Sequence, residues 1–195
     1  MRNRSRLGLI VTALLAVVAF VGLGSGAASA SVSPAAESVL PYTYQAQETG
    51  YWCSAAAAKI ALSARGVSVS QSELASYMNV TPDVGLPDIG NLESALDTYE
   101  GTTYYEVKQW SSDSELASKL QADVLYNVDR GHAVVINVIR IADASFPGGH
   151  YATIVGYRNG GSEYLIADPA SSARSGIWLG SDDVASGIKL RRYVA

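Results

Sequence analysis

The amino-acid sequence predicts an α+β domain in which helices come first and strands follow. Residues 53–130 place apolar side chains at helical spacing, in segments that begin at capping residues and end at glycines. Residues 132–194 instead hold short β-branched runs separated by Gly, Asn and Pro. Helices followed by strands, rather than alternating with them, indicate an N-terminal helical lobe and a C-terminal antiparallel β-sheet lobe.

Residues 1–30 have the pattern of a secretory signal peptide. Three arginines among the first six residues precede an apolar stretch over residues 7–23, and Ala28-Ser29-Ala30 supplies the small residues that a signal peptidase requires. A single membrane anchor is the alternative, but small residues crowd the end of the stretch and no basic flank follows it. We therefore expect a protein that is secreted, or associated with the cell envelope, and that is not stably inserted in the membrane after cleavage.

The rest of the chain is predicted to form one domain. Residues 31–41 contain Ser, Ala and Pro and are interpreted as a linker, while the domain itself is expected over residues 42–195. A first strand is expected near residues 40–44. The length is sufficient for a single hydrophobic core.

The first predicted helix begins at Cys53, the only cysteine in the chain. An alanine-rich run with Ile60 and Leu62 follows this cysteine, and Gly66 provides a natural end. The thiol is therefore expected at the N-terminus of a helix, where unpaired N–H groups and the helix dipole favour the thiolate.

Three more helices are expected before the strands of the second half. Ser70 opens the second helix with a capping box, Asp88 begins a third that closes at Gly101, and residues 114–130 form a fourth. A strand over residues 102–107 separates the third helix from the fourth. Later strands are expected at residues 132–139, 150–157, 163–168, 176–179 and 189–194, with a loop over 140–149 and a helical turn over 181–186.

Asn159 and Gly160 mark a hairpin turn between two of these strands. Folding the chain about this turn places position 150 opposite positions 168–170, on strands about 4.8 Å apart. Asp168 is therefore expected beside His150, unless the register slips by one residue and turns it to the other face. A carboxylate there can orient the imidazole and leave its other ring nitrogen for a thiol.

Composition argues against several classes of partner. Without residues 1–30 the chain has 11 basic and 18 acidic residues, a net charge of −7, and no basic cluster. Nucleic acid and anionic membranes are therefore not expected as partners. Two distant histidines and one cysteine do not make a zinc site, so no metal or cofactor is expected. A single cysteine in an exported protein indicates either an intermolecular disulfide or a reactive thiol.

The residues around Cys53 and His150 together resemble the papain-like cysteine peptidases. Gln47 lies six residues before Cys53, Gly149-His150 begins a strand, and Asp168-Pro169 ends the next strand. This order is similar to that of the branch related to bacteriocin double-glycine leader peptidases, and the resemblance covers about residues 42–194. It implies a papain-like fold with Cys53, His150 and Asp168 as the catalytic triad. It also implies that Gln47 and the backbone N–H of Cys53 form the oxyanion hole, each donor contributing about 3 kcal/mol.

Other residues compete for these roles. His132 follows Gly131 at a strand start and is interpreted as a structural or surface histidine, because no acidic residue follows it on a hairpin partner. Gln45 is a rival to Gln47 on spacing alone. Tyr51 and Trp52 either line a substrate groove or pack the helix against the sheet.

The sequence thus predicts a secreted cysteine peptidase that hydrolyses peptide or protein substrates through an acyl-enzyme on Cys53. A thiol acyltransferase, transglutaminase or amidase with the same triad stays open, since the sequence does not distinguish water from an amine as the acceptor. A non-catalytic secreted binding protein on the same scaffold is a third interpretation. Its support is Ser54-Ala55, which stands where this family often has Gly or Gly-Pro after the nucleophile.

Overall fold

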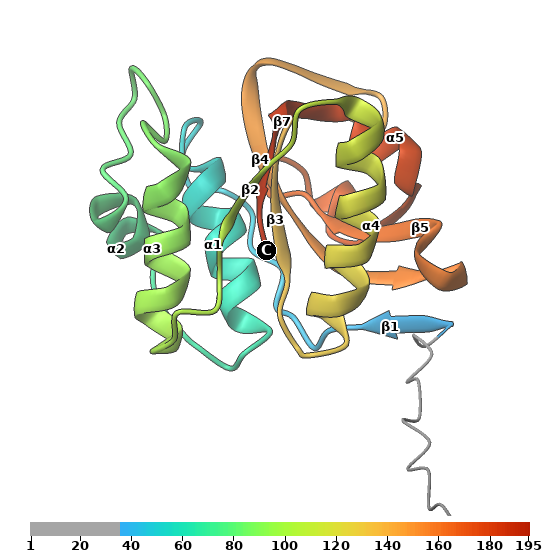
Figure 1. The fold of residues 1–195 in the computed structure, drawn as a ribbon. Coiled ribbons are helices and arrows are strands. Elements are labelled where there is room, and N and C mark those ends of the chain that lie inside the picture. The colour runs from blue at the N-terminus through green and yellow to red at the C-terminus, as the bar shows by residue number, and fades with distance from the viewer. Residues whose placement is uncertain (1–35) are drawn as a thin grey trace, which may run out of the picture. The chain divides into compact units, whose positions relative to one another are not determined.

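A computed structural model describes residues 36–195 of the chain (Figure 1). The signal peptide predicted for residues 1–30 lies outside the described residues. From residue 36 onward, no helix combines the length and apolar character needed to span a bilayer.

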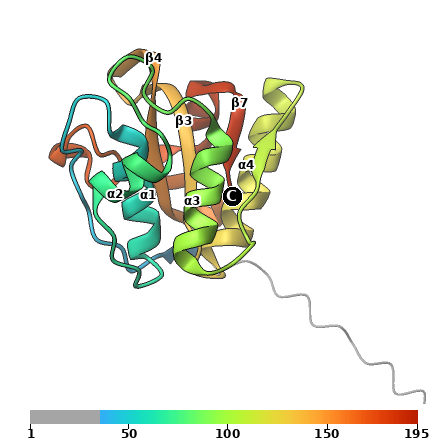
Figure 2. The same ribbon diagram turned by 90° about the vertical axis from the view of Figure 1, so that its left-hand side faces the viewer.

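Three helices form the N-terminal lobe: α1 (Cys53–Ser63), α2 (Gln71–Tyr77) and α3 (Ile89–Glu100). Helix α1 is central, since it packs against α2, α3 and the sheet. Its alanines at positions 55–58 are all fully buried, and their small side chains let the helix lie close to its neighbours. Figure 2 shows α1–α3 together on one side of the sheet.

The helix ends follow the capping signals of the sequence. The Ser70 side chain accepts a hydrogen bond from the N–H of Glu73, and Asp88 accepts one from Gly90. Gly101 closes α3 in the left-handed conformation, with φ of 69°. Each cap pairs backbone groups that a helix end leaves free, which fixes where α2 and α3 begin and end.

The C-terminal half folds into one antiparallel sheet in which the order of strands is β2-β7-β3-β4-β5-β6, with β1 paired to β4. The described strands are β1 (Glu37–Val39), β2 (Val107–Gln109), β3 (Val134–Ile141), β4 (Ala144–Arg158), β5 (Glu163–Ala167), β6 (Ile177–Gly180) and β7 (Ile188–Val194). Helices α4 (Asp113–Val128) and α5 (Ser181–Gly187) pack against the sheet on the side away from α1, as Figure 1 shows. Short 3₁₀ turns occupy Asn159–Gly161 and Ser172–Arg174.

The predicted hairpin is present. Asn159, Gly160 and Gly161 all have positive φ, the conformation that an Asn-Gly-Gly sequence tolerates best. Strands β4 and β5 pair on either side of this turn, with Arg158 opposite Glu163 and Thr153 opposite Ala167. The register is therefore close to the one that the turn residues predict.

Three expectations for the strands were wrong in position. The first strand is Glu37–Val39, within the segment interpreted as linker, because Pro41 has no N–H to continue the ladder. The strand expected at residues 102–107 begins only at Val107. The loop expected at residues 140–149 is largely strand, because the chain turns at residues 142–143, where Ala142 has a φ of 49°.

Strand β4 tolerates Pro147 and two glycines because it bulges there. Val138 on β3 faces His150, whereas Arg140 faces Ser145, so five steps along β4 correspond to two along β3. The residues between Ser145 and His150 lie outside the regular ladder, where a missing N–H costs no hydrogen bond. The bulge comes immediately before His150.

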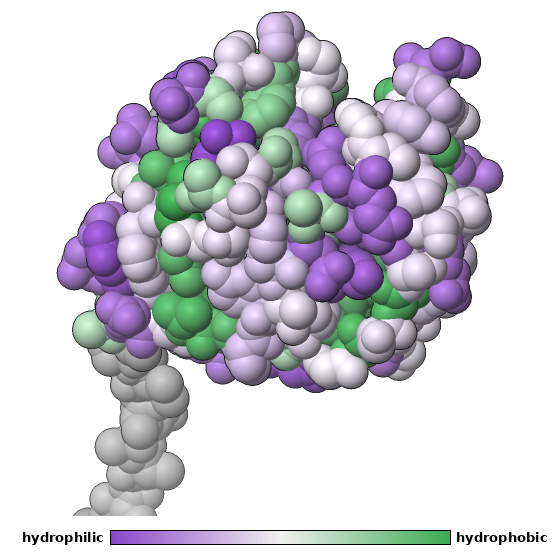
Figure 3. Space-filling view, turned by 180° about the vertical axis from the view of Figure 1, so that it is seen from behind, coloured by the Kyte–Doolittle hydropathy of each residue, from purple (hydrophilic) through white to green (hydrophobic). Residues whose placement is uncertain are grey.

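Hydrophobic side chains from both lobes form the core. It joins residues of α1–α3 to the inner faces of β3, β4 and β7, and continues through the sheet to α4 and α5. Seen from behind, hydrophilic and near-neutral residues cover most of the surface, with hydrophobic residues in narrow bands between them (Figure 3). This distribution fits the acidic composition of the chain.

Candidate active site

Cys53 is the first residue of α1 and is half-buried. The residue before it, Trp52, makes no side-chain cap, so N–H groups of the first turn remain available. The backbone N–H groups of Ser54 and Tyr151 both donate to the sulfur. A buried hydrogen bond of 2.9 Å from Thr153 Oγ1 to the carbonyl of Ala57 ties β4 to α1. The thiol is thereby held against the strand that carries His150.

His150 lies on β4, buried between the thiol and a carboxylate. Its Nε2 lies 2.6 Å from Oδ1 of Asp168, and its side chain also hydrogen-bonds the Cys53 thiol. Because Nε2 is engaged by Asp168, the nitrogen that faces the sulfur is Nδ1. The structure thus brings together the three residues that the hairpin and the cysteine helix indicated.

A glycine with a left-handed backbone precedes this histidine. Gly149 has a φ of 100°, and a Cβ there would lie 3.1 Å from Oδ1 of Asn137 and 3.0 Å from Nζ of Lys189. Both the backbone conformation and the lack of space favour glycine. The Gly-His pair of the sequence therefore has a structural reason: it lets β4 leave its bulge and present the imidazole.

Asp168 is fully buried at the end of β5 and accepts three hydrogen bonds. Oδ1 accepts from His150 and from the N–H of Ala170 at 2.9 Å, while Oδ2 accepts from Nε of Arg174 at 2.5 Å. A buried carboxylate with this many donors is held in one orientation. Arg174 was missing from the sequence interpretation, since it lies in an irregular segment six residues beyond Asp168 with no motif to mark it.

These contacts shift the titration of all three groups. Burial by itself raises the pKa of the Cys53 thiol, but the hydrogen bond and charge of His150 and the two backbone N–H groups outweigh burial and lower it. Burial lowers the pKa of His150, yet hydrogen bonds to Asp168 and Cys53 and the charges of both raise it to about 9. Burial also opposes ionisation of Asp168, but His150, Arg174 and the Ala170 N–H keep its pKa below the usual value. The favoured state is a thiolate beside an imidazolium.

Phe146 covers the imidazole. Its ring stacks on that of His150, with centroids 4.2 Å apart and planes 19° from parallel. An aromatic face at this position keeps water from the hydrogen bond between His150 and Asp168, which strengthens that bond. Phe146 lies in the bulge of β4, in the segment expected to be a loop, so this contact is not predictable from the local sequence pattern.

Gln47 lies close to the end of β5. Its backbone N–H donates to the carbonyl of Pro169 at 2.9 Å, which places it beside the Asp-Pro pair. Its side-chain Nε2 donates to the carbonyl of Thr49 at 2.8 Å, and its Oε1 is buried without a partner. In this conformation one of the two amide hydrogens of Gln47 is bound to the carbonyl of Thr49. Gln45 instead lines a surface hollow with Lys59 and Ser63.

His132, interpreted from the sequence as a structural or surface histidine, is buried and has an acidic neighbour. Its Nδ1 lies 3.4 Å from Oε2 of Glu100, and its ring stacks on Tyr104 with centroids 3.7 Å apart. Val138 is the residue of β3 that faces His150. His132 lies six residues before Val138, which corresponds to about 20 Å of extended chain, so the two histidines are far apart. Burial and the charge of Arg65 lower the pKa of His132, so it stays neutral.

Tyr51 and Trp52 precede Cys53 in the chain and touch each other edge to face, with ring centroids 6.1 Å apart. Trp52 packs against the main core, whereas Tyr51 does not belong to it. Packing is therefore part of the role of Trp52, as one of the two interpretations expected.

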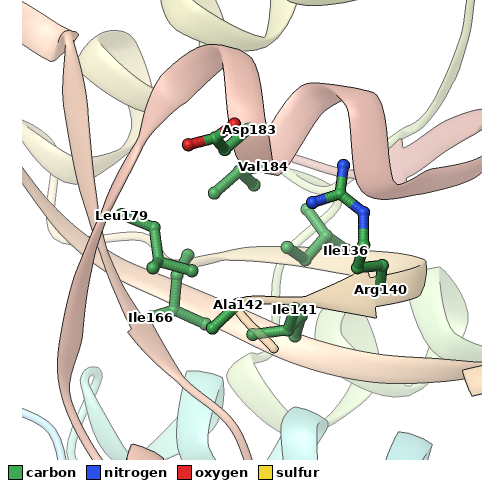
Figure 4. Close-up of a pocket in the computed structure, with 8 residues that line it drawn as sticks. All are labelled: Ile136, Arg140, Ile141, Ala142, Ile166, Leu179, Asp183 and Val184. Atoms are coloured by element: carbon green, nitrogen blue, oxygen red, sulfur yellow. The ribbon is translucent and has the colours of Figure 1, made fainter. Parts of the chain in front are cut away.

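Two cavities lie near the sheet, on different faces. One, of about 150 Å³, has Cys53 in its wall. The other, of about 130 Å³, lies under α5 and is mostly apolar, with Arg140 and Asp183 at its edge (Figure 4). Because α5 and α1 cover different faces, the second cavity is separated from the thiol by the sheet. Among residues 36–195, no three His, Cys, Asp or Glu side chains group in a way that suits a metal ion.

Comparisons with known proteins identify the family and the fold. A family model described as the Peptidase_C39 like family matches residues 39–187. A search of curated proteins gives no match.

Solved structures share the fold at low sequence identity. The peptidase domain of Streptococcus ComA, a bifunctional ABC transporter of a quorum-sensing pathway, is 15% identical with a TM-score of 0.53 over 78% of this chain and 97% of its own. A double-glycine-motif protease from an AMS/PCAT transporter, solved with its leader peptide, is 15% identical with a TM-score of 0.55, over 80% and 91%. A C39-like peptidase structure from Bacillus anthracis is 13% identical with a TM-score of 0.55, over 81% and 96%. These likenesses show the fold, a helical lobe followed by an antiparallel sheet.

Proposed function

Because the chain belongs to the C39-like peptidase family, which has the papain-like cysteine peptidase fold, we propose that it hydrolyses peptide bonds with Cys53 as the nucleophile. One observation carries the proposal: His150 is hydrogen-bonded to the Cys53 thiol on one side and to the buried carboxylate of Asp168 on the other. In this arrangement Cys53 is the nucleophile, His150 is the base that contacts it, and Asp168 orients the base, as acyl transfer requires.

The reaction begins with the thiolate, since the lowered pKa of Cys53 and the raised pKa of His150 place the proton on the imidazole. The sulfur attacks the peptide carbonyl, and the imidazolium gives its proton to the leaving amine, which departs and leaves a thioester on Cys53. A water molecule then loses a proton to His150 and attacks the thioester, releasing the acid and restoring the thiolate. Asp168 holds the ring in place throughout.

The oxyanion formed at each step needs donors. The N-terminus of α1 supplies the backbone N–H of Cys53, and the Gln47 amide is the nearest side-chain candidate from the sequence. In this proposal the amide leaves the carbonyl of Thr49 when substrate binds, so Gln47→Ala lowers kcat by roughly a hundredfold while KM changes little.

The experiment that tests the function is incubation of the protein with a defined peptide library, followed by mass spectrometry. Cleavage by the wild type and none by Cys53→Ala supports hydrolysis. Products joined to an added amine, with no hydrolysis, indicate acyl transfer by the same three residues. No change in any peptide contradicts both reactions.

We also propose that the protein acts outside the cytoplasm, since residues 1–30 have the pattern of a signal peptide. N-terminal sequencing of exported protein is expected to begin near Ser31. Exported protein that retains the apolar stretch of residues 7–23 would instead indicate a membrane anchor.

A further inference from the structure

A groove of about 150 Å³ opens directly beside Cys53. One wall comes from residues 84–89, where the chain enters α3, and the other comes from β3, β4 and β7. Because the reacting sulfur is part of the lining, a substrate positioned over Cys53 places its neighbouring groups in this groove.

The sheet wall of the groove is shaped by a bulge in β7. Val138 of β3 faces Ile188, whereas Ile136 faces Tyr193, so five steps along β7 correspond to two along β3. Leu190 and Arg191 within the bulge have φ values of 56° and 53°, left-handed conformations that cost about 1–3 kcal/mol each for residues other than glycine. Strained bulges of this kind often re-aim side chains beside active sites.

Residues of the bulge place two cationic side chains and one exposed apolar side chain in the lining of the groove. Lys189 and Arg192 both line it. Leu190, 60% exposed, stands at the same wall, opposite Val84, which is 68% exposed. These are the two most exposed large hydrophobic residues in the described part of the chain, and exposed apolar side chains that gather at a pocket with a few polar groups often mark a binding site.

Among residues 36–195, no Asp or Glu lines the groove beside these cations, and the one anion in the lining is the Cys53 thiolate, whose charge His150 balances. Nζ of Lys189 donates to the carbonyl of Gly148 at 2.5 Å, a neutral acceptor. Asp88 is the acidic residue close enough to act on Tyr151 in the groove, but its carboxylate caps α3 through the N–H of Gly90. In a chain with 18 acidic residues, a groove lined by two cations and no acid is a marked local exception.

Two buried polar atoms of the lining residues lack partners. Nε of Arg192 and Oδ1 of Asn137 are both inaccessible to solvent and without a hydrogen bond, and Asn137 as a whole is only 7% exposed. A buried unpaired polar group costs about 1–3 kcal/mol, so each atom suits a partner that arrives with a ligand. The guanidinium only donates, and a carboxylate fits its fork of N–H groups. The amide oxygen only accepts, and the N–H of a peptide is a matching donor.

We infer that this groove binds a carboxylate of the peptide substrate next to the bond that Cys53 attacks, with Arg192 and Lys189 as specificity-determining residues. The inference deepens the proposed peptidase function and rests on it. A carboxylate in a peptide comes from an Asp or Glu side chain or from the C-terminus, and the experiment separates the two sources.

The first measurement is cleavage of paired peptides that differ only in Glu or Gln at one position near the cut bond. We expect kcat/KM for the Glu peptide to exceed that for the Gln peptide by roughly tenfold, the equivalent of one charge-assisted hydrogen bond, and this ratio to fall towards one in Arg192→Gln and Lys189→Met. Arg191→Gln is the matched control, because it removes the same charge one residue away but does not line the groove. Peptides with amidated C-termini show whether the terminal carboxylate is the group recognised.

The second measurement needs no turnover. Iodoacetate carries a carboxylate and iodoacetamide does not, so the ratio of their alkylation rates at Cys53 reports the groove's affinity for an anion and cancels changes in thiol reactivity. We expect this ratio to fall by about threefold or more in Lys189→Met and in Arg192→Gln, and to stay unchanged in Arg191→Gln. Lys189 is half-exposed, so its variant keeps the test valid if Arg192→Gln does not fold.

The outcomes separate the two proposals. If no peptide is cleaved but the alkylation ratio depends on Lys189 and Arg192, the anion-binding groove stands and the peptidase proposal falls. If peptides are cleaved with equal rates for Glu and Gln, with no effect of C-terminal amidation and an unchanged alkylation ratio, the inference about the groove is overturned and the peptidase proposal stands.

Discussion

At the scale of single residues, the position of one proton decides what Cys53 and His150 do near neutral pH. The thiol is buried enough that it would ordinarily stay protonated, yet His150 and two backbone N–H groups lower its pKa. Asp168 in turn raises the pKa of the imidazole, so the histidine takes the proton that the thiol gives up. Because the two groups titrate as a coupled pair, their protonation is best measured on both together.

Alkylation by iodoacetamide is expected to detect this ion pair without a substrate. Native protein should react well below pH 8.5, the ordinary thiol pKa, because the thiolate is already formed. In His150→Ala the stabilising partner is gone while the burial remains, so the rate profile should shift to higher pH. A profile that rises only above about pH 8 in both proteins would mean that no ion pair exists.

Replacement of the two histidines should separate catalysis from structure. His150→Ala is expected to lower kcat/KM by about 10²–10⁴-fold, since it removes the general base, whereas Asp168→Asn should be milder because an amide still orients the ring. His132→Ala is the control: it loses a ring stacked on Tyr104 and should lower the melting temperature while leaving activity per folded molecule nearly unchanged. Equal losses of activity at both histidines would contradict the assignment.

At the scale of secondary structure, short-range signals in the sequence identified most elements. Ser70, Asp88 and Gly101 mark helix ends through local hydrogen bonds and backbone angles, and each does so in the structure. Asn159-Gly160 fixes the β4–β5 hairpin for the same reason, and from it the proximity of His150 and Asp168 follows. These features depend on a few neighbouring residues, which is why the sequence alone predicts them.

Features that depend on distant residues were not predictable in the same way. The bulges of β4 and β7 arise from pairing with β3, and side-chain periodicity does not reveal residues outside the ladder. The contacts of Phe146 and Arg174 with the site follow from that tertiary arrangement. The hydrogen bond of the Gln47 amide to Thr49 likewise depends on loop geometry rather than on spacing along the chain.

The glycines at the two ends of α5 provide a test of element packing. A Cβ on Gly187 would lie 2.5 Å from the carbonyl oxygen of Arg140, whereas a Cβ on Gly180 would meet nothing closer than 3.5 Å. Gly187→Ala is therefore expected to lower the free energy of unfolding by about 1–3 kcal/mol, because the backbone of β3 has to move. Gly180→Ala makes no such clash and should lower it by only about 0.5–1 kcal/mol, the cost of replacing a glycine N-cap by alanine. Urea unfolding of both variants gives the comparison, and equal effects would contradict the close packing of α5 on β3.

At the scale of the whole molecule, the buried Asp168 should make stability fall in acid. Its pKa is below the ordinary value of about 3.9, so its contribution is complete above that pH and is lost as the pH falls through the lower, folded value. We expect the unfolding midpoint of the wild type to approach that of Asp168→Asn in this range. A constant difference between the two proteins from pH 6 down to pH 2 would contradict a lowered pKa.

Near and above neutral pH, the free energy of unfolding should change little between about pH 6.5 and 8.5. A raised histidine pKa alone gives stability that is complete below 6.5 and lost as the pH rises through about 9. The lowered pKa of Cys53 has the opposite sign, since its contribution is complete only above the unfolded thiol pKa. Where the folded thiol is already ionised, the folded pair holds one proton on His150 and the unfolded chain holds one on Cys53, so the proton counts cancel. Cys53→Ala removes the cancellation and also the part of the His150 shift that Cys53 supplies, so this variant should lose stability as the pH rises only as far as Asp168 still raises the pKa of His150.

The bulge of β7 has a consequence for engineering. Residues 189–191 lie between the pairs with β3 that end at Ile188 and resume at Tyr193, while Arg192 stays paired with Gln109 of β2. A loop graft confined to Lys189 and Leu190 would change the wall of the groove while leaving both ladders of β7 in place. His150 and Asp168 lie on other strands and would keep their places. Substrate recognition by the groove can therefore be redesigned without changing the residues proposed to carry out catalysis.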